Sequence, residues 1–238
     1  MRLLVANPNS SEAITDLCVA LAREAASAGT DVVAWTNRQG PTVIDSVYGD
    51  YMAGRPLVLG LSRLRPPPDA VVLAGFGNYG TAAVKEIFDT PVIGMAEAAM
   101  VFALPLCHRF AIVTTAPQMI PYTEDILRLS GLAERCATVR AVSLPPMSAA
   151  PPPEAQIVVE LAAIVQAVRV EVGADLVILG GSRLSRYAAA LRRVVPIPVL
   201  EPVACAVQLA EALVRLGLRQ SKAGKFAFPP QPLSEYGE

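Results

Sequence analysis

The feature that most constrains the fold is an internal repeat. Three segments recur about 107 residues further along the chain, in the same order. The matched pairs are RLLVANPNS at residue 2 and RFAIVTTAP at 109, DAVVLAGFG at 69 and DLVILGGSR at 175, and PVIGMAEAAM at 91 and PVLEPVACAV at 198. A repeat on this scale predicts two copies of one structural unit, which join near residues 104–109.

Each copy shows short apolar runs that alternate with longer amphipathic ones, a pattern typical of strands followed by helices. The predicted strands are 2–6, 31–36, 70–74, 91–93, 109–114, 138–143, 175–179 and 197–200. The predicted helices are 11–28, 81–88, 97–106, 117–130, 154–172 and 202–216. Ser10 or Ser11 can cap the first helix, and Gly131 and Gly173 lie where helix C-caps are expected.

This alternation predicts an α/β protein with two pseudo-symmetric, doubly wound parallel-sheet lobes and a site in the cleft between them. We expect the first lobe to contain residues 1–105 and the C-terminal segment from about 201 to 238. The second lobe is expected to contain residues 106–200.

Composition narrows the function classes. Apolar residues make up 53% of the chain, charged residues 17%, and the net charge is -1, which is typical of a well-packed domain. Without a basic stripe or a long apolar run, neither nucleic acid nor a membrane is an expected partner. We expect a cytoplasmic homo-oligomer that binds a small molecule and uses no cofactor. The single histidine and the scattered cysteines argue against a metal site.

In parallel α/β sheets, ligands bind beyond the carboxyl ends of the strands. The repeat makes two pairs of such loops equivalent: 7–11 with 114–118, and 75–81 with 181–186. If the halves face each other about a pseudo-dyad, Gly75 lies opposite its counterpart in the second half across one shared cleft.

Several motifs extend over nearly the whole chain. They are NPNSS at 7–11, GFGNYG at 75–80, PVIGMAEAAM at 91, FAIVTT at 110–115, ADLVILGG at 174, and LGLRQSK at 216. With these motifs the chain resembles the aspartate/glutamate/hydantoin racemase superfamily, and most closely the hydantoin and allantoin racemases. The resemblance implies the two-lobed fold and a mechanism in which one cysteine thiolate removes a proton and a second, opposite thiol returns it.

The two positions that the resemblance assigns to these cysteines are Gly75 and Gly181. Glycine has no side chain that can transfer a proton, so a two-thiol mechanism is excluded. Cys18 is expected within the first helix, and Cys107 and Cys136 before strands, on the side of the sheet opposite the cleft. Cys205 is expected in the first turn of the last helix, where the helix dipole lowers the pKa of a thiol, but its repeat partner is Ala98, which favours a buried core position.

The candidate substrate-binding residues lie in the loops at the predicted cleft. They are Asn7, Ser10, Gly75, Phe76, Gly77, Asn78, Thr114, Thr115, Gly181, Ser182 and Arg183. Asn7 and Ser10 fit helix capping as well as they fit ligand contact. Arg183 fits a substrate carboxylate and a solvent-facing helix position equally well.

Three groups are candidates for proton transfer: Tyr79, Ser182 and Glu201. The first hypothesis is an isomerase- or lyase-type enzyme that binds a carboxylate or cyclic amide and stabilises an enolate-like intermediate. The arylmalonate decarboxylases of the same superfamily, which keep one cysteine, are a partial precedent. The second hypothesis is a catalytically inactive, metabolite-binding relative.

Overall fold

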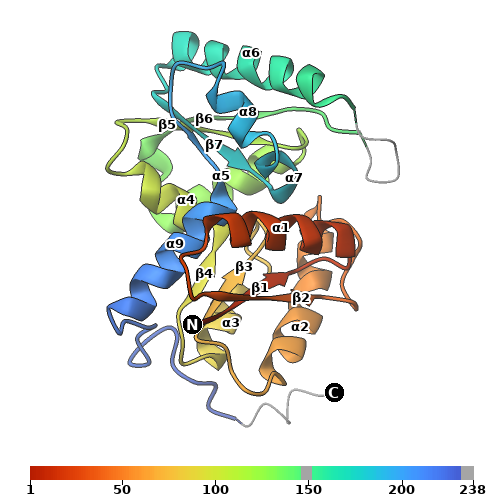
Figure 1. Cartoon of the computed structure of the whole chain (residues 1–238), viewed down its shortest axis with the longest axis vertical. Coiled ribbons are helices and arrows are strands. Elements are labelled where there is room, and N and C mark those ends of the chain that lie inside the picture. Colours follow the sequence, from red (N-terminus) through yellow and green to blue (C-terminus); the bar gives the residue numbers. More distant parts are fainter. Residues whose placement is uncertain (146–151, 232–238) are drawn as a thin grey trace.

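The computed structural model describes residues 1–145 and 152–231, and these residues form two four-stranded parallel sheets (Figure 1). The first sheet has the order β2-β1-β3-β4 and the second the order β6-β5-β7-β8. The strands are β1 (Arg2–Asn7), β2 (Asp31–Thr36), β3 (Ala70–Leu73), β4 (Val92–Gly94), β5 (Phe110–Thr114), β6 (Cys136–Ala141), β7 (Leu176–Gly180) and β8 (Val199–Leu200). The identical strand orders confirm the predicted α/β fold with two pseudo-symmetric parallel sheets.

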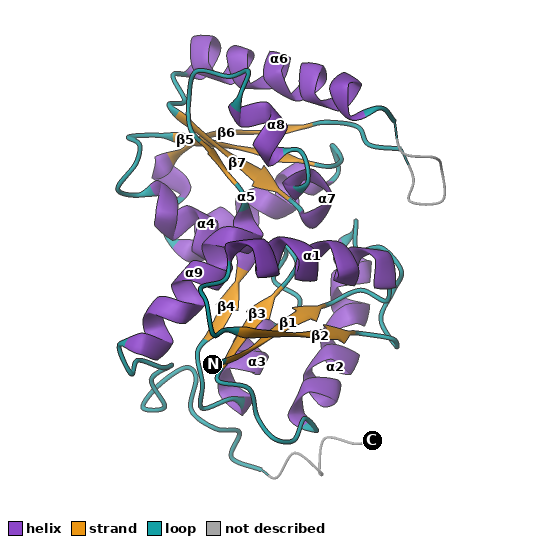
Figure 2. Cartoon of the chain, viewed as in Figure 1, coloured by secondary structure: helices purple, strands orange, loops and turns teal. Residues whose placement is uncertain are grey.

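Helices connect successive strands and cover both faces of each sheet (Figure 2). They are α1 (Glu12–Ala25), α2 (Val47–Ser62), α3 (Thr81–Ile87), α4 (Met95–Ala103), α5 (Met119–Ser130), α6 (Glu154–Val172), α7 (Ser182–Ser185), α8 (Ala188–Arg192) and α9 (Pro202–Arg215), with a 3₁₀ turn at Ala133–Arg135. Ser11 caps α1, while Gly131 and Gly173 end α5 and α6 in the left-handed conformation. These ends confirm the predicted caps.

The central strands β3, β5 and β7 are buried at every residue, because helices lie on both sides of them. This burial explains why their sequences are continuous apolar runs rather than alternating ones. Every helix among residues 1–145 and 152–231 is too short or too polar to span a bilayer.

Two helices connect the halves. Val207 and Ala210 of α9, which follows the second sheet in the chain, pack in one core with Val5 of the first sheet. Met100 of α4, which follows the first sheet, packs with Ile112 of the second. Each half therefore shares a helix with the other, which fixes the relative position of the strand ends that form the site. The boundaries of the lobes at 105 and 201 stay a prediction.

Helix α2 is not predicted by the sequence pattern, which leaves residues 47–62 without a regular element. Its three glycines and Pro56 are poor helix formers. Leu57 and Leu61 nevertheless pack in the core beneath the first sheet, and this burial outweighs the weak propensity. Gly60 is needed there because a Cβ would lie 2.5 Å from the Trp35 ring. The short helices α7 and α8 are likewise absent from the prediction.

Candidate functional site

A cavity of about 340 Å³ lies between the halves, at the carboxyl ends of the strands. The loops after β1, β3, β5 and β7 each contribute to its wall, through Pro8, Gly75, Thr115 and Gly181 respectively. The segment 42–45 before α2, the start of α5, Ile14 of α1 and Leu144 also line it. The pseudo-symmetry thus brings the loops that contain Gly75 and Gly181, the two glycine loops, to the same cavity.

The predicted residues divide into two groups. Those that line the cavity are Gly75, Phe76, Tyr79, Thr114, Thr115, Gly181, Ser182 and Arg183. Those that do not line it, among the residues the structure describes, are Asn7, Ser10, Gly77, Asn78 and Glu201. The ligand-binding role of every one of these residues stays a prediction.

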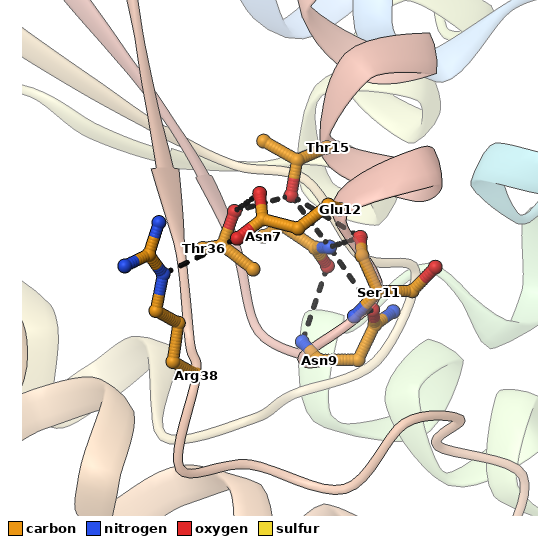
Figure 3. Close-up of polar contacts among 7 residues, drawn as sticks. All are labelled: Asn7, Asn9, Ser11, Glu12, Thr15, Thr36 and Arg38. Atoms are coloured by element: carbon orange, nitrogen blue, oxygen red, sulfur yellow. Dashed lines mark hydrogen bonds and ion pairs between the residues drawn. The ribbon is translucent and has the colours of Figure 1, made fainter.

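Asn7 is fully buried and its side chain is used by its own loop (Figure 3). Its Nδ2 donates to the carbonyl oxygen of Ser11 and to Oγ1 of Thr15, both at 3.0 Å. Its Oδ1 accepts the N–H of Asn9 at 3.1 Å, and Oδ1 of Asn9 in turn accepts the N–H of Ser11. Asn7 is therefore not the cap of α1, which is Ser11. Its bonds support the β1–α1 loop, which presents Pro8 to the cavity.

The outer part of the same network lies at the surface. Glu12 accepts a hydrogen bond from Thr36 Oγ1 at 2.8 Å and pairs with Arg38 at 3.2 Å (Figure 3). Both charged side chains are more than half exposed, so this pair contributes little to stability. It orients the start of α1 and the end of β2 rather than a ligand.

The ring of Tyr79 fills the space above Gly75. A Cβ added at Gly75 would overlap Cε2 of Tyr79 and lie 2.8 Å from Cγ of Pro8, and one added at Gly77 would overlap Cζ of Tyr79. Tyr79 itself has a φ of 31°, in the left-handed region. Burial, together with the negative charge of Asp50, raises the pKa of the Tyr79 phenol, so the phenol is protonated at neutral pH.

Tyr122 of α5 connects the two halves at the cavity wall. Its hydroxyl donates to Oδ2 of Asp50 in α2 at 2.7 Å and accepts the N–H of Asn78 at 2.8 Å. The backbone N–H of Asn78, which is predicted to bind the substrate, therefore already donates a hydrogen bond within the protein. The sequence does not reveal this cluster because its members lie 44 and 72 residues from Tyr122.

The loop after β7 presents the cation of the site. Gly181 has a φ of 150°, and Ser182 Oγ donates to the carbonyl oxygen of Ala74 at 3.2 Å, which connects the two glycine loops. Arg183 is half-buried and donates to the carbonyl oxygen of Pro145. Partial burial lowers its pKa, and no carboxylate in the described part of the chain lies within ion-pair distance of it. An anionic ligand would supply the missing charge.

The carboxylate of Glu201 caps the start of α9. Its Oε1 accepts the N–H of Val203 and its Oε2 that of Ala204, both at 2.7 Å, and the residue is 5% exposed. A carboxylate at this position satisfies two N–H groups that the helix leaves free.

We expect Glu201→Ala to lower the free energy of unfolding by about 1 kcal/mol, through loss of the cap, and to leave activity per folded molecule unchanged. Urea denaturation measures the first effect. Glu201→Asp, which retains an N-cap carboxylate, is the control and should recover most of the loss. Normal stability combined with lost activity would return Glu201 to the catalytic candidates.

The cysteines do not line the cavity described above. Burial raises the pKa of Cys18 and Cys136 to about 11 and that of Cys205 to about 12, and it also raises the pKa of Cys107. All four thiols are therefore protonated at neutral pH and are weak nucleophiles. Among the described residues, no group of three His, Cys, Asp or Glu side chains is placed to hold a metal ion.

Thiol alkylation tests this assignment. We expect iodoacetamide at neutral pH to leave enzymatic activity and ligand binding unchanged, because no thiolate lies at the site. Mass spectrometry of the intact protein would count the modified cysteines. Loss of activity in proportion to a single modified thiol would contradict the expectation.

Comparison with known proteins defines the class. Residues 3–210 match the model of the Asp/Glu/Hydantoin racemase family, and the chain belongs to this family. It is 34% identical over 233 residues to a hydantoin racemase of Paenarthrobacter aurescens, a match that covers 97% of this chain and 98% of the relative.

Solved structures show the same fold. The structure of an allantoin racemase from Klebsiella pneumoniae superposes with a TM-score of 0.89 at 32% identity, covering 98% of this chain and 95% of that one. A crystal structure of arylmalonate decarboxylase, at 18% identity, shares the fold with a TM-score of 0.64 over 90% of this chain and 92% of that one.

Proposed function

We propose that this protein is an isomerase- or lyase-type enzyme that binds a small carboxylate or cyclic amide and stabilises an enolate-like intermediate without a pair of thiols. One observation carries the proposal: a single cavity contains both glycine loops and the half-buried Arg183, and no cysteine is among its described lining residues. The names of the relatives support a cyclic amide as the substrate class, since hydantoin and allantoin share one ring.

The chemistry follows from charge placement. When a proton or carbon dioxide leaves the carbon next to a carbonyl group, negative charge develops on the carbonyl oxygen. Arg183 can donate hydrogen bonds to that oxygen, or two parallel ones to a substrate carboxylate. In a cavity partly closed to water, such a fixed cation stabilises the transition state more than it would in solution.

Proton NMR in deuterated buffer tests the proposal. The panel contains 5-alkyl hydantoins, allantoin, amino acids and substituted malonates, each with an enzyme-free blank. We expect catalysed deuterium uptake at the acidic carbon, or loss of carbon dioxide, with at least one compound. No turnover of any compound by folded protein would contradict it.

A non-catalytic relative is the second candidate. It is favoured because each predicted proton-transfer group already has a structural role. Glu201 caps a helix, Ser182 Oγ donates to the carbonyl oxygen of Ala74, and Tyr79 is a buried phenol. Such a protein would be stabilised against heat by a ligand that it never converts.

We also propose that the chain works in the cytoplasm as a homo-oligomer. Support for assembly comes from α2, where the side chains of Val47, Tyr48 and Tyr51 are 69%, 76% and 85% exposed. A surface of this kind is often covered by a second copy. Light scattering on the purified chain measures the assembly directly.

A further inference from the structure

Tyr122 and Asp50 form a hydrogen-bonded pair at the wall of the cavity. Tyr122 lines the cavity, whereas Asp50 lies behind it and is half-buried. The 2.7 Å bond from the Tyr122 hydroxyl to Oδ2 of Asp50 fixes the direction of the hydroxyl proton. The Asn78 N–H, at 2.8 Å, holds the Tyr122 oxygen from another side.

The hydrogen bond connects the hydroxyl oxygen of Tyr122, which can accept a proton from a substrate, to the carboxylate of Asp50, which can accept the phenol proton. The other phenol of the cavity, Tyr79, is packed against Gly75 and Gly77. Among the described residues that line the cavity, Tyr122 is the one whose side chain donates a hydrogen bond to a carboxylate.

We propose that Tyr122 is the catalytic acid and base of this site and that Asp50 is its positioning residue and proton acceptor. The inference rests on the proposed function. It assigns to these two residues the proton transfer that a thiol cannot perform here.

The step balances without a further reactant. The proton on the substrate carbon moves to the oxygen of Tyr122 while the phenol proton moves to Oδ2 of Asp50. The electron pair of the broken C–H bond forms the enolate, whose oxygen Arg183 neutralises. The half-exposed Asp50 then exchanges its proton with water, and the reverse transfer returns a solvent proton to carbon.

We call the paired proton transfer through Tyr122 and Asp50 the relay. The environment of Tyr122 suits this relay better than it suits a free phenolate. Burial, the neighbouring phenol of Tyr79 and the carboxylate of Asp50 raise the pKa of Tyr122, so the hydroxyl stays neutral between turnovers. The relay can remove and return a proton on one face of the substrate only. We therefore expect the wild-type enzyme to exchange the carbon-bound proton of one enantiomer with solvent faster than it inverts that enantiomer.

The test compares single-atom variants in the deuterium-exchange assay. Tyr122→Phe keeps the ring and removes the hydroxyl, and Asp50→Asn keeps an oxygen acceptor but removes its charge. We expect about a 100- to 10,000-fold lower kcat for Tyr122→Phe and at least a tenfold lower kcat for Asp50→Asn, each with little change in KM. Asp16→Asn, at an exposed position of α1, is the matched control and should exchange at the wild-type rate.

The outcomes separate the two proposals. If the wild type exchanges a substrate and Tyr122→Phe does so at the same kcat, the relay is refuted while the proposed function stands. The same holds if the variant loses thermal stability but its folded fraction keeps the wild-type kcat. If the folded wild type turns over no compound, the proposed function fails, and the relay fails with it.

Discussion

Replacing Arg183 by glutamine is expected to weaken ligand binding and lower kcat/KM by roughly 10- to 150-fold. That range corresponds to about 1.5–3 kcal/mol for a hydrogen bond to a charged group. The guanidinium is half-buried at the cavity wall and pairs with no described carboxylate, and we propose that an anionic ligand is its counterion. Titration calorimetry with a substrate or carboxylate inhibitor measures the affinity.

Arg193→Gln is the matched control, because Arg193 is exposed and lies outside the cavity lining. It should bind and react as the wild type does. The assignment of Arg183 would be contradicted if both variants bound equally well, or if Arg183→Gln changed only the melting temperature.

Introducing cysteine at Gly75 is expected to destabilise the protein by about 1–3 kcal/mol, the usual effect of overpacking a filled site. The new Cβ would overlap the ring of Tyr79, which is buried. Tyr79→Ala should relieve the overlap, so the double variant should be more stable than the sum of the two single effects predicts. Urea denaturation of the four proteins measures this coupling.

Gly224→Cys is the control, because a Cβ there meets nothing within 4 Å. It should be close to neutral. Additive effects at Gly75 and Tyr79 would show that the Tyr79 ring does not occupy the position of a side chain at residue 75. The same steric argument means that a thiol pair at Gly75 and Gly181 would need a smaller residue at Tyr79 before it could act.

Much of the fold follows from the sequence because repeats and apolar runs are local signals. The pattern predicted eight strands close to their observed positions, and the cap at Ser11 follows from local chemistry. Helix α2 was missed because its glycines and Pro56 weaken the helical signal, while the burial of Leu57 that stabilises it is a long-range effect.

The site shows the same division. Pseudo-symmetry predicted which loops meet, since equivalent strand ends in a repeated unit face a common cleft. Individual roles depend on three-dimensional partners that sequence spacing does not show. The sequence makes Glu201 a candidate for proton transfer, but its carboxylate accepts the N–H groups of Val203 and Ala204 at the start of α9. Tyr122 was missed because Asp50 belongs to the unpredicted α2.

We propose that this racemase-family site works without paired thiols. The rate of proton exchange with solvent, relative to the rate of inversion of the substrate, distinguishes such a site from a two-thiol one. Each enantiomer of one 5-alkyl hydantoin is incubated with the enzyme in deuterated buffer, and NMR and chiral chromatography follow deuterium uptake and inversion together. We expect deuterium uptake into one enantiomer to be clearly faster than its inversion and to persist after treatment with iodoacetamide. Equal rates from both enantiomers, abolished by thiol alkylation, would contradict it.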